Sequence, residues 1–163
     1  MIIIGYQGIG KSSSISSDNK FIDLESGNFW FNGEDGNLTR HNNWYIPYCN
    51  IAEHLSQQGY TVFVSSHKEV RNQLKKSKEL VVACYPDISL KNQWIKRLRE
   101  RYEKTGLEKD WKAFVNADER FEENIKEIEE DCRFKIKIDS MNYSLSSLIY
   151  KFMYFHKRGE TER

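Results

Sequence analysis

The stretch that decides the fold is Met1-Ile2-Ile3-Ile4-Gly5-Tyr6-Gln7-Gly8-Ile9-Gly10-Lys11-Ser12. It begins with a continuous apolar run rich in β-branched residues, which is typical of a strand buried on both faces. Its last eight residues match the pattern G-x-x-x-x-G-K-[ST] at every fixed position. The sequence therefore predicts a phosphate-binding loop, or P-loop, between a central parallel strand over 2–4 and a short helix over 12–18.

Each residue type in this loop has a physical task. Glycines permit backbone angles that a Cβ forbids, so that successive N–H groups can surround a phosphate. The lysine supplies a cation for the β- and γ-phosphates, and the serine that follows it supplies a hydroxyl for Mg²⁺. The residues expected to bind ATP are Gly5, Gln7, Gly8, Ile9, Gly10, Lys11, Ser12 and Ser13. The alternative is a Gly-rich turn after an edge strand, with no ligand.

Composition excludes several classes of protein. The chain has 163 residues and a formal net charge of +1, so no global field attracts it to nucleic acid or to an anionic membrane. Cys49, Cys84 and Cys132 are far apart and form no C-x-x-C pair, which argues against a disulfide framework or a zinc site. No apolar run approaches the length of a membrane span. We expect a cytoplasmic protein with no membrane partner, and oligomeric state stays open.

Strand and helix patterns alternate along the chain, which predicts an α/β fold. The expected strands cover 2–4, 21–24, 60–64, 80–85 and 134–138, and the expected helices cover 12–18, 47–58, 68–76, 89–103, 107–130 and a last segment capped by Ser144. This order indicates one three-layer α/β/α domain over 1–156 with a five-stranded parallel sheet. Strand 134–138 alternates strictly and should lie near an edge. Residues 157–163 read as a charged, disordered tail.

Two carboxylates mark the end of the second predicted strand. Asp23 and Glu25 lie at its carboxyl end, where ligands bind in open α/β sheets. At positions i and i+2, their side chains leave the strand on the same face. They are candidates for binding the substrate that accepts a group, with Asp23 also a candidate base or ligand of metal-bound water. The alternative is a solvated strand end.

Residues 28–47 have no clean period and form an insertion that we assign to the acceptor region. A strong turn signal, Gly33-Glu34-Asp35-Gly36-Asn37, lies among several aromatic residues. Aromatic rings in a polar segment suit a site that stacks a flat ring, although anchoring of the loop to the core is the slightly stronger interpretation. Arg40 is a candidate for gripping a phosphate with its planar fork.

A basic helix over 88–105 has the character of a lid. Arg97 and Arg101 are four residues apart and therefore share a helical face. Arginines that reach a γ-phosphoryl group stabilise the charge that spreads over its three oxygens during transfer. The alternative is an ordinary solvated face, because the helix carries charges of both signs. No carboxylate follows strand 60–64, where Ser65, Ser66 and His67 stand instead.

The order of elements resembles the nucleoside-monophosphate-kinase-like branch of the P-loop fold. Phe21-Ile22-Asp23-Leu24-Glu25 is similar to the F-x-D-x-[DE] at the end of the second strand in small P-loop kinases such as shikimate kinase. The whole chain resembles a compact, phage-type P-loop nucleotide kinase. The resemblance implies that Lys11 and Ser12 bind phosphate and Mg²⁺, that Asp23 faces the acceptor, and that an arginine of 90–101 closes over ATP. Neither D-G-[FY]-P-R nor G-G-G follows the third strand, which leaves the acceptor open.

These observations together predict an ATP-dependent, Mg²⁺-dependent kinase for a nucleotide, most directly a (deoxy)nucleoside monophosphate. Two alternatives stay open: a P-loop kinase for a hydroxyl acceptor (a nucleoside, a small metabolite or a polynucleotide 5′-end), and an ATP-binding regulatory protein with little turnover. The expected catalytic residues are Lys11, Asp23, Arg97 and Arg101, the acceptor residues are Asp23, Glu25 and Arg40, and the Mg²⁺ residues are Ser12 and Asp23.

Overall fold

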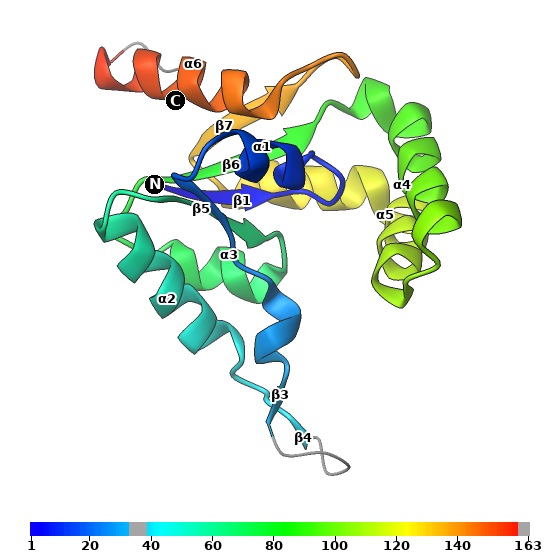
Figure 1. Cartoon of the computed structure of the whole chain (residues 1–163), viewed down its shortest axis with the longest axis horizontal. Coiled ribbons are helices and arrows are strands. Elements are labelled where there is room, and N and C mark those ends of the chain that lie inside the picture. Colours follow the sequence, from blue (N-terminus) through cyan, green and yellow to red (C-terminus); the bar gives the residue numbers. More distant parts are fainter. Residues whose placement is uncertain (33–38, 160–163) are drawn as a thin grey trace.

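A five-stranded parallel sheet organises the protein (Figure 1). The computed structural model describes residues 1–32 and 39–159, and for residues 17, 31, 32, 39 and 40 it describes the backbone alone. The strands of the sheet are β1 (Ile2–Gly5), β2 (Phe21–Asp23), β5 (Thr61–Ser65), β6 (Val81–Pro86) and β7 (Phe134–Ile138), and a separate antiparallel pair consists of β3 (Phe31–Asn32) and β4 (Thr39–Arg40). The helices are α1 (Lys11–Ser17), α2 (Tyr45–Gln57), α3 (Lys68–Leu74), α4 (Lys91–Thr105), α5 (Glu108–Asp131) and α6 (Leu145–Lys157), and two 3₁₀ turns cover Ser26–Phe29 and Ile88–Leu90.

β1 is the central strand, as its apolar run predicted. The strand order is β2-β5-β1-β6-β7, and Ile3 lies between Phe63 of β5 and Val82 of β6. All four residues of β1 are buried, because strands cover both of its edges and helices cover both of its faces. The expected α/β class with a five-stranded parallel sheet is therefore confirmed.

The direction of each connection decides which face its helix covers. From β1 the chain crosses to the outer edge at β2, and the next three crossovers all run in the opposite direction. Since parallel crossovers share one hand, the first helix must lie on the other face from those that follow. α1 packs beside α6 on one face, and α2, α3 and α5 lie on the other (Figure 1). The loops after β1 and β6 therefore diverge, which opens a crevice at the carboxyl edge of the sheet.

α4 and α5 form a helical hairpin at this edge (Figure 1). α4 ends at Gly106, which has a left-handed φ of 63° and lets the chain reverse. Trp94 and Leu98 are the fully buried residues of α4, at 0% and 1% exposure. α5 has a kink at Arg120, with φ −133° and ψ 22°. The helix that we expected to act as a lid therefore packs along α5 and faces the P-loop with its apolar side.

Several local expectations hold and others need correction. β7 covers the predicted residues and is an edge strand, and the Ser144 hydroxyl accepts a hydrogen bond from the Ser147 N–H at 3.3 Å. α2 begins at Tyr45, not at Pro47, because proline is tolerated throughout the first turn of a helix. The predicted turn at 33–37 and the end of the tail, 160–163, lie outside the described residues.

The cysteines lie in the interior of the protein. The three cysteines are free thiols and all are buried, with Cys84 at 0% exposure in the core. Burial raises the pKa of the Cys84 thiol to about 12. Within 1–32 and 39–159, no helix combines the length and the apolar character needed to cross a bilayer.

A buried cation joins the helices of one face. Arg71 of α3 is 5% exposed and pairs with Asp131 and Glu127 of α5, each at 2.8 Å. Its guanidinium also donates to the Ser66 carbonyl at 2.6 Å. Because a buried ion whose partner is removed keeps its desolvation cost, the network fixes α3 against the end of α5.

Arg71→Met should lower the free energy of unfolding by about 2–4 kcal/mol, since it leaves two carboxylates without their buried partner. Urea denaturation measures the change. Lys96→Met is the matched control, because Lys96 and Glu100 form an exposed i,i+4 pair with side chains 76% and 61% exposed. The control should stay within about 0.5 kcal/mol. Equal losses in the two variants would contradict the assigned role.

The same network predicts a pH dependence. Burial opposes ionisation of Asp131, but hydrogen bonds from Lys75 and Arg71 outweigh it, and the pKa of Asp131 falls below its ordinary 3.8. A depressed folded pKa stabilises the fold above the unfolded pKa and loses that effect in acid. The stability gap between the native protein and Asp131→Asn should be constant from about pH 7 to 5 and close as the pH falls toward about 2. A gap that widens in acid, in urea titrations, contradicts this.

Candidate functional site

The loop over 6–10 joins the carboxyl end of β1 to the first turn of α1, and we keep the name P-loop for it because residues 5–12 match that sequence pattern. Gly8 and Gly10 have left-handed φ values of 83° and 90°, which favour glycine. A Cβ on Gly8 would also lie 2.9 Å from Leu98 Cδ2, whereas one on Gly10 would meet no atom within 4 Å. Gly8 is therefore required by both its backbone angle and the approach of α4, and Gly10 by its angle alone.

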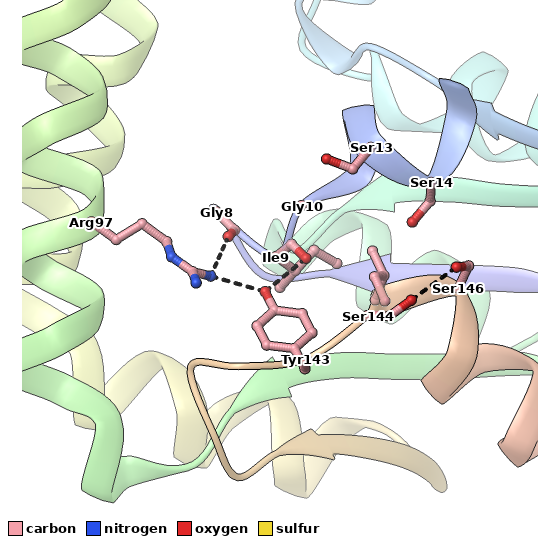
Figure 2. A pocket seen from close by; sticks show the side chains of 10 residues that line it. Gly8, Ile9, Gly10, Ser13, Ser14, Arg97, Tyr143, Ser144 and Ser146 are labelled. Atoms are coloured by element: carbon pink, nitrogen blue, oxygen red, sulfur yellow. Dashed lines mark hydrogen bonds between the residues drawn. The ribbon is translucent and has the colours of Figure 1, made fainter. Parts of the chain in front are cut away.

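Side chains from two other elements donate to the P-loop. Trp94 Nε1 of α4 donates to the Gln7 carbonyl at 2.8 Å. The Tyr143 hydroxyl, in the loop between β7 and α6, donates to the Ile9 carbonyl at 2.8 Å (Figure 2). Arg97 Nη1 reaches the carbonyl between them, that of Gly8, at a longer 3.3 Å. Three consecutive carbonyls of the loop are thus bonded from outside it.

Two of the residues predicted for the site, Lys11 and Asp23, contact each other directly. Lys11 Nζ lies 3.0 Å from Asp23 Oδ1, and both side chains are about one-quarter exposed, at 26% and 25%. Lys11 is the first residue of α1 and Asp23 the last of β2. The cation expected to bind phosphate and the carboxylate expected to face the acceptor therefore occupy one place, although β2 and β1 are not neighbours in the sheet.

A cavity of about 530 Å³ opens beside the P-loop, within the range of small-molecule sites. Its lining consists of Gly8, Ile9, Gly10, Ser13, Ser14, Arg97, Tyr143, Ser144, Leu145 and Ser146. Figure 2 shows Ser13 and Ser14 of α1 on one side, Ser144 and Ser146 at the start of α6, and Arg97 reaching in from α4. The cavity thus combines hydroxyl groups with one cation.

Arg97 lies at this cavity with neutral partners. Its guanidinium donates to the Tyr143 hydroxyl at 2.9 Å and to the Met141 carbonyl at 3.4 Å, and it lies 4.6 Å from the centre of the Trp94 ring. Among the described residues, no carboxylate forms an ion pair with it. Its charge therefore remains available to an anion in the cavity.

Arg101 does not share this position. Its guanidinium pairs with Asp110 Oδ1 at 2.6 Å, and Asp110 is buried at 2% exposure in α5. Thr105 donates to the other oxygen of the same carboxylate at 2.5 Å. Residues four apart share a face of α4 but lie one turn apart. Arg97 thus lines the cavity, and its lid role stays a prediction, whereas Arg101 is paired with Asp110 and joins α4 to α5.

The other expected acceptor residues are less closely gathered. Glu25 lies just beyond β2 with its side chain 53% exposed, and Lys109 Nζ of α5 is 4.0 Å away. The tip of the α4–α5 hairpin therefore reaches back toward the end of β2. Arg40 belongs to β4, where its backbone is paired with Phe31; the position of its side chain is outside what the structure describes.

The aromatic residues of the insertion mainly anchor it to the core. Trp44 is 5% exposed and packs against the ring of Tyr48 at 5.5 Å. The Tyr48 hydroxyl donates to the Leu24 carbonyl at 2.7 Å and accepts from the Ser65 N–H at 2.9 Å. It therefore ties the ends of β2 and β5 together, and burial raises its pKa. His67 stands beside this cluster, with Nδ1 2.8 Å from Ser65 Oγ.

Of the expected ATP ligands that have a side chain, Gln7 and Ile9 have theirs engaged with the protein. The Gln7 amide donates to the Ala113 carbonyl of α5 at 2.9 Å, and the Ile9 side chain is fully buried. Ser12 is exposed in the first turn of α1, and Ser13 lines the cavity. Neither Trp94 nor Tyr143 is among the site residues predicted from the sequence. Trp94 belongs to the apolar stripe of α4, and a pattern of apolar residues does not reveal that its indole N–H donates a hydrogen bond.

Within the described part of the chain, no three His, Cys, Asp or Glu side chains are grouped so that they could hold a metal ion. Comparison with models of known protein families and with curated proteins gave no match.

Gly10→Ala should weaken the binding of tripolyphosphate about 5- to 30-fold, because forcing a Cβ into a left-handed φ costs about 1–2 kcal/mol and the loop can relieve this cost only by moving. Gly59→Ala is the matched control, since Gly59 has a φ of 91° and equally open space but lies in the turn before β5. Both variants should remain folded in urea titrations. Isothermal titration calorimetry should detect weaker binding in Gly10→Ala alone, and equal affinities would refute the loop as a phosphate site.

Proposed function

We propose that this protein transfers the γ-phosphoryl group of ATP to a nucleotide acceptor, most directly a (deoxy)nucleoside monophosphate. The observation that carries the proposal is the 3.0 Å contact between Lys11, at the end of the P-loop, and Asp23. A cation suited to bind phosphate and a carboxylate suited to face the acceptor thus lie together at the carboxyl edge of the sheet, where ligands of α/β proteins bind. In the transfer, the bond from the γ-phosphorus to its bridging oxygen breaks, and a bond to the acceptor oxygen forms.

The charges around the P-loop support this chemistry. Lys11 would neutralise the β- and γ-phosphates, and Arg97, which lines the cavity beside the P-loop, would supply a second positive charge from α4. Phosphoryl transfer depends mainly on positioning and on stabilising charge that spreads over the oxygens of the moving group. Two fixed cations on different elements meet this demand better than one.

The residues also fit a magnesium ion that is bound jointly with the substrate. Mg²⁺ usually takes one or two protein oxygens and completes its shell with phosphates and water. Ser12, exposed in the first turn of α1, and Asp23, beside Lys11, would be the protein contributions. Bound there, the ion would neutralise phosphate charge.

The same contact favours a second candidate, a hydroxyl acceptor. A carboxylate within 3.0 Å of Lys11 is well placed to take the proton of an attacking hydroxyl. A phosphate acceptor is already ionised and needs no base, so for that acceptor Asp23 would act through the magnesium ion and its bound water. A regulatory ATP-binding protein with little turnover is the remaining outcome.

ADP release in the presence of each nucleoside monophosphate, deoxynucleoside monophosphate and nucleoside tests the proposal. We expect one acceptor class to stimulate turnover, and Lys11→Ala to reduce that rate at least about 100-fold because the phosphates lose their cation. ATP binding without stimulation by any acceptor would sink the kinase proposal and favour the regulatory role.

Asp23→Asn separates the two acceptor classes. For a hydroxyl acceptor the turnover rate should fall about 10²- to 10⁴-fold with ATP affinity within a few-fold of native, because the base is lost and the phosphate site is not. For a phosphate acceptor the rate should fall less than about tenfold. Asp118→Asn is the control, since Asp118 is an exposed carboxylate of α5 and should not alter the rate.

A further inference from the structure

The outward carbonyls of the P-loop pose a structural problem that is separate from phosphate binding. For successive N–H groups to converge on an anion, the carbonyls between them must point away from it. Such carbonyls need partners when they lie against the protein. Here the carbonyls of Gln7, Gly8 and Ile9 all find side-chain donors.

Two of these donors are held rigidly. Trp94 is fully buried in α4, and its ring stacks on that of Tyr143 at 6.3 Å with an angle of 14° between the planes. Their hydrogen bonds to the loop are both 2.8 Å long. The Arg97 guanidinium lies over both rings, 4.6 Å and 5.5 Å from their centres. The Tyr143 phenol is protonated and able to donate at neutral pH, and burial raises its pKa further above the ordinary 10.0.

We infer that Trp94 and Tyr143 are positioning residues that hold the P-loop in its phosphate-binding conformation before any ligand arrives. The inference rests on the proposed function in one respect, that this loop binds a polyphosphate. Gly8 and Gly10 give the loop the required angles, but glycine is also the residue with the most backbone freedom to lose. Fixing the neighbouring carbonyls removes that freedom in advance, so that less entropy is lost on binding.

The arrangement also connects the phosphate site to the rest of the cavity. Trp94 belongs to the α4–α5 hairpin, and Tyr143 to the segment that leads into α6. Each of these elements forms a wall of the cavity beside the P-loop (Figure 2). A displacement of either wall would therefore release one of the carbonyls and loosen the loop.

The test compares tripolyphosphate with MgATP on Tyr143→Phe and Trp94→Phe. Each substitution keeps an aromatic ring and removes one donor to the loop, so each should weaken the binding of both ligands about 3- to 10-fold. Isothermal titration calorimetry measures the affinities, and thermal unfolding of the ligand-free proteins shows whether the fold is kept. Should Trp94→Phe fail to fold, Tyr143→Phe alone decides.

Tripolyphosphate is the deciding ligand, because Tyr143 also lines the cavity. A direct contact of Tyr143 with the base or ribose would weaken ATP alone and leave tripolyphosphate unchanged, which would overturn the inference. Tyr150→Phe and Trp111→Phe are matched controls on α6 and α5, with side chains 46% exposed, and should bind both ligands within about twofold of native.

The two proposals fail in different ways. If the native protein binds neither tripolyphosphate nor ATP, the proposed function fails. If the native protein binds both, and Tyr143→Phe binds tripolyphosphate equally well, the positioning role fails while the proposed function stands.

Discussion

Burial of β1 on all sides is the constraint on which the rest of the structure depends. Its four residues are covered by β5 and β6 at the edges and by helices on both faces. A strand so enclosed cannot continue into solvent gradually, and the chain must turn at once where the sheet ends. Gly8 and Gly10, with left-handed angles, provide that turn. The crossovers that diverge from β1 and β6 then leave space beside Gly8 and Gly10. The fold and the candidate site therefore have a common origin.

Much of this was accessible from the sequence because the relevant signals are local. The apolar run of β1, the glycine spacing of the P-loop, the strict alternation of β7 and the Ser144 cap each depend on neighbouring residues. The joint position of Lys11 and Asp23 also followed, since parallel strands place their carboxyl ends at one edge. For these features, periodicity and geometry within a short window are sufficient.

The remaining features required tertiary contacts that no local pattern contains. Arg97 and Arg101 are equivalent on a helical wheel, and only the reversal of the chain at Gly106 brings Asp110 to the second of them. Trp94 is buried among the apolar residues of α4, but the partner of its N–H is 87 residues away in the chain. The stabilising role of Arg71 depends in the same way on carboxylates 56 and 60 residues away.

The two cations at the site are compensated unequally, and this asymmetry limits the chemistry that the site can perform. Lys11 has a carboxylate partner at 3.0 Å, whereas Arg97 has neutral partners. In the proposed reaction, an incoming polyphosphate meets the free charge of Arg97 without competition but must share Lys11 with Asp23. Phosphate oxygens would then compete with Asp23 for the Lys11 ammonium. Binding of the phosphoryl donor would therefore be linked to the position of Asp23, on the acceptor side, through one ion pair.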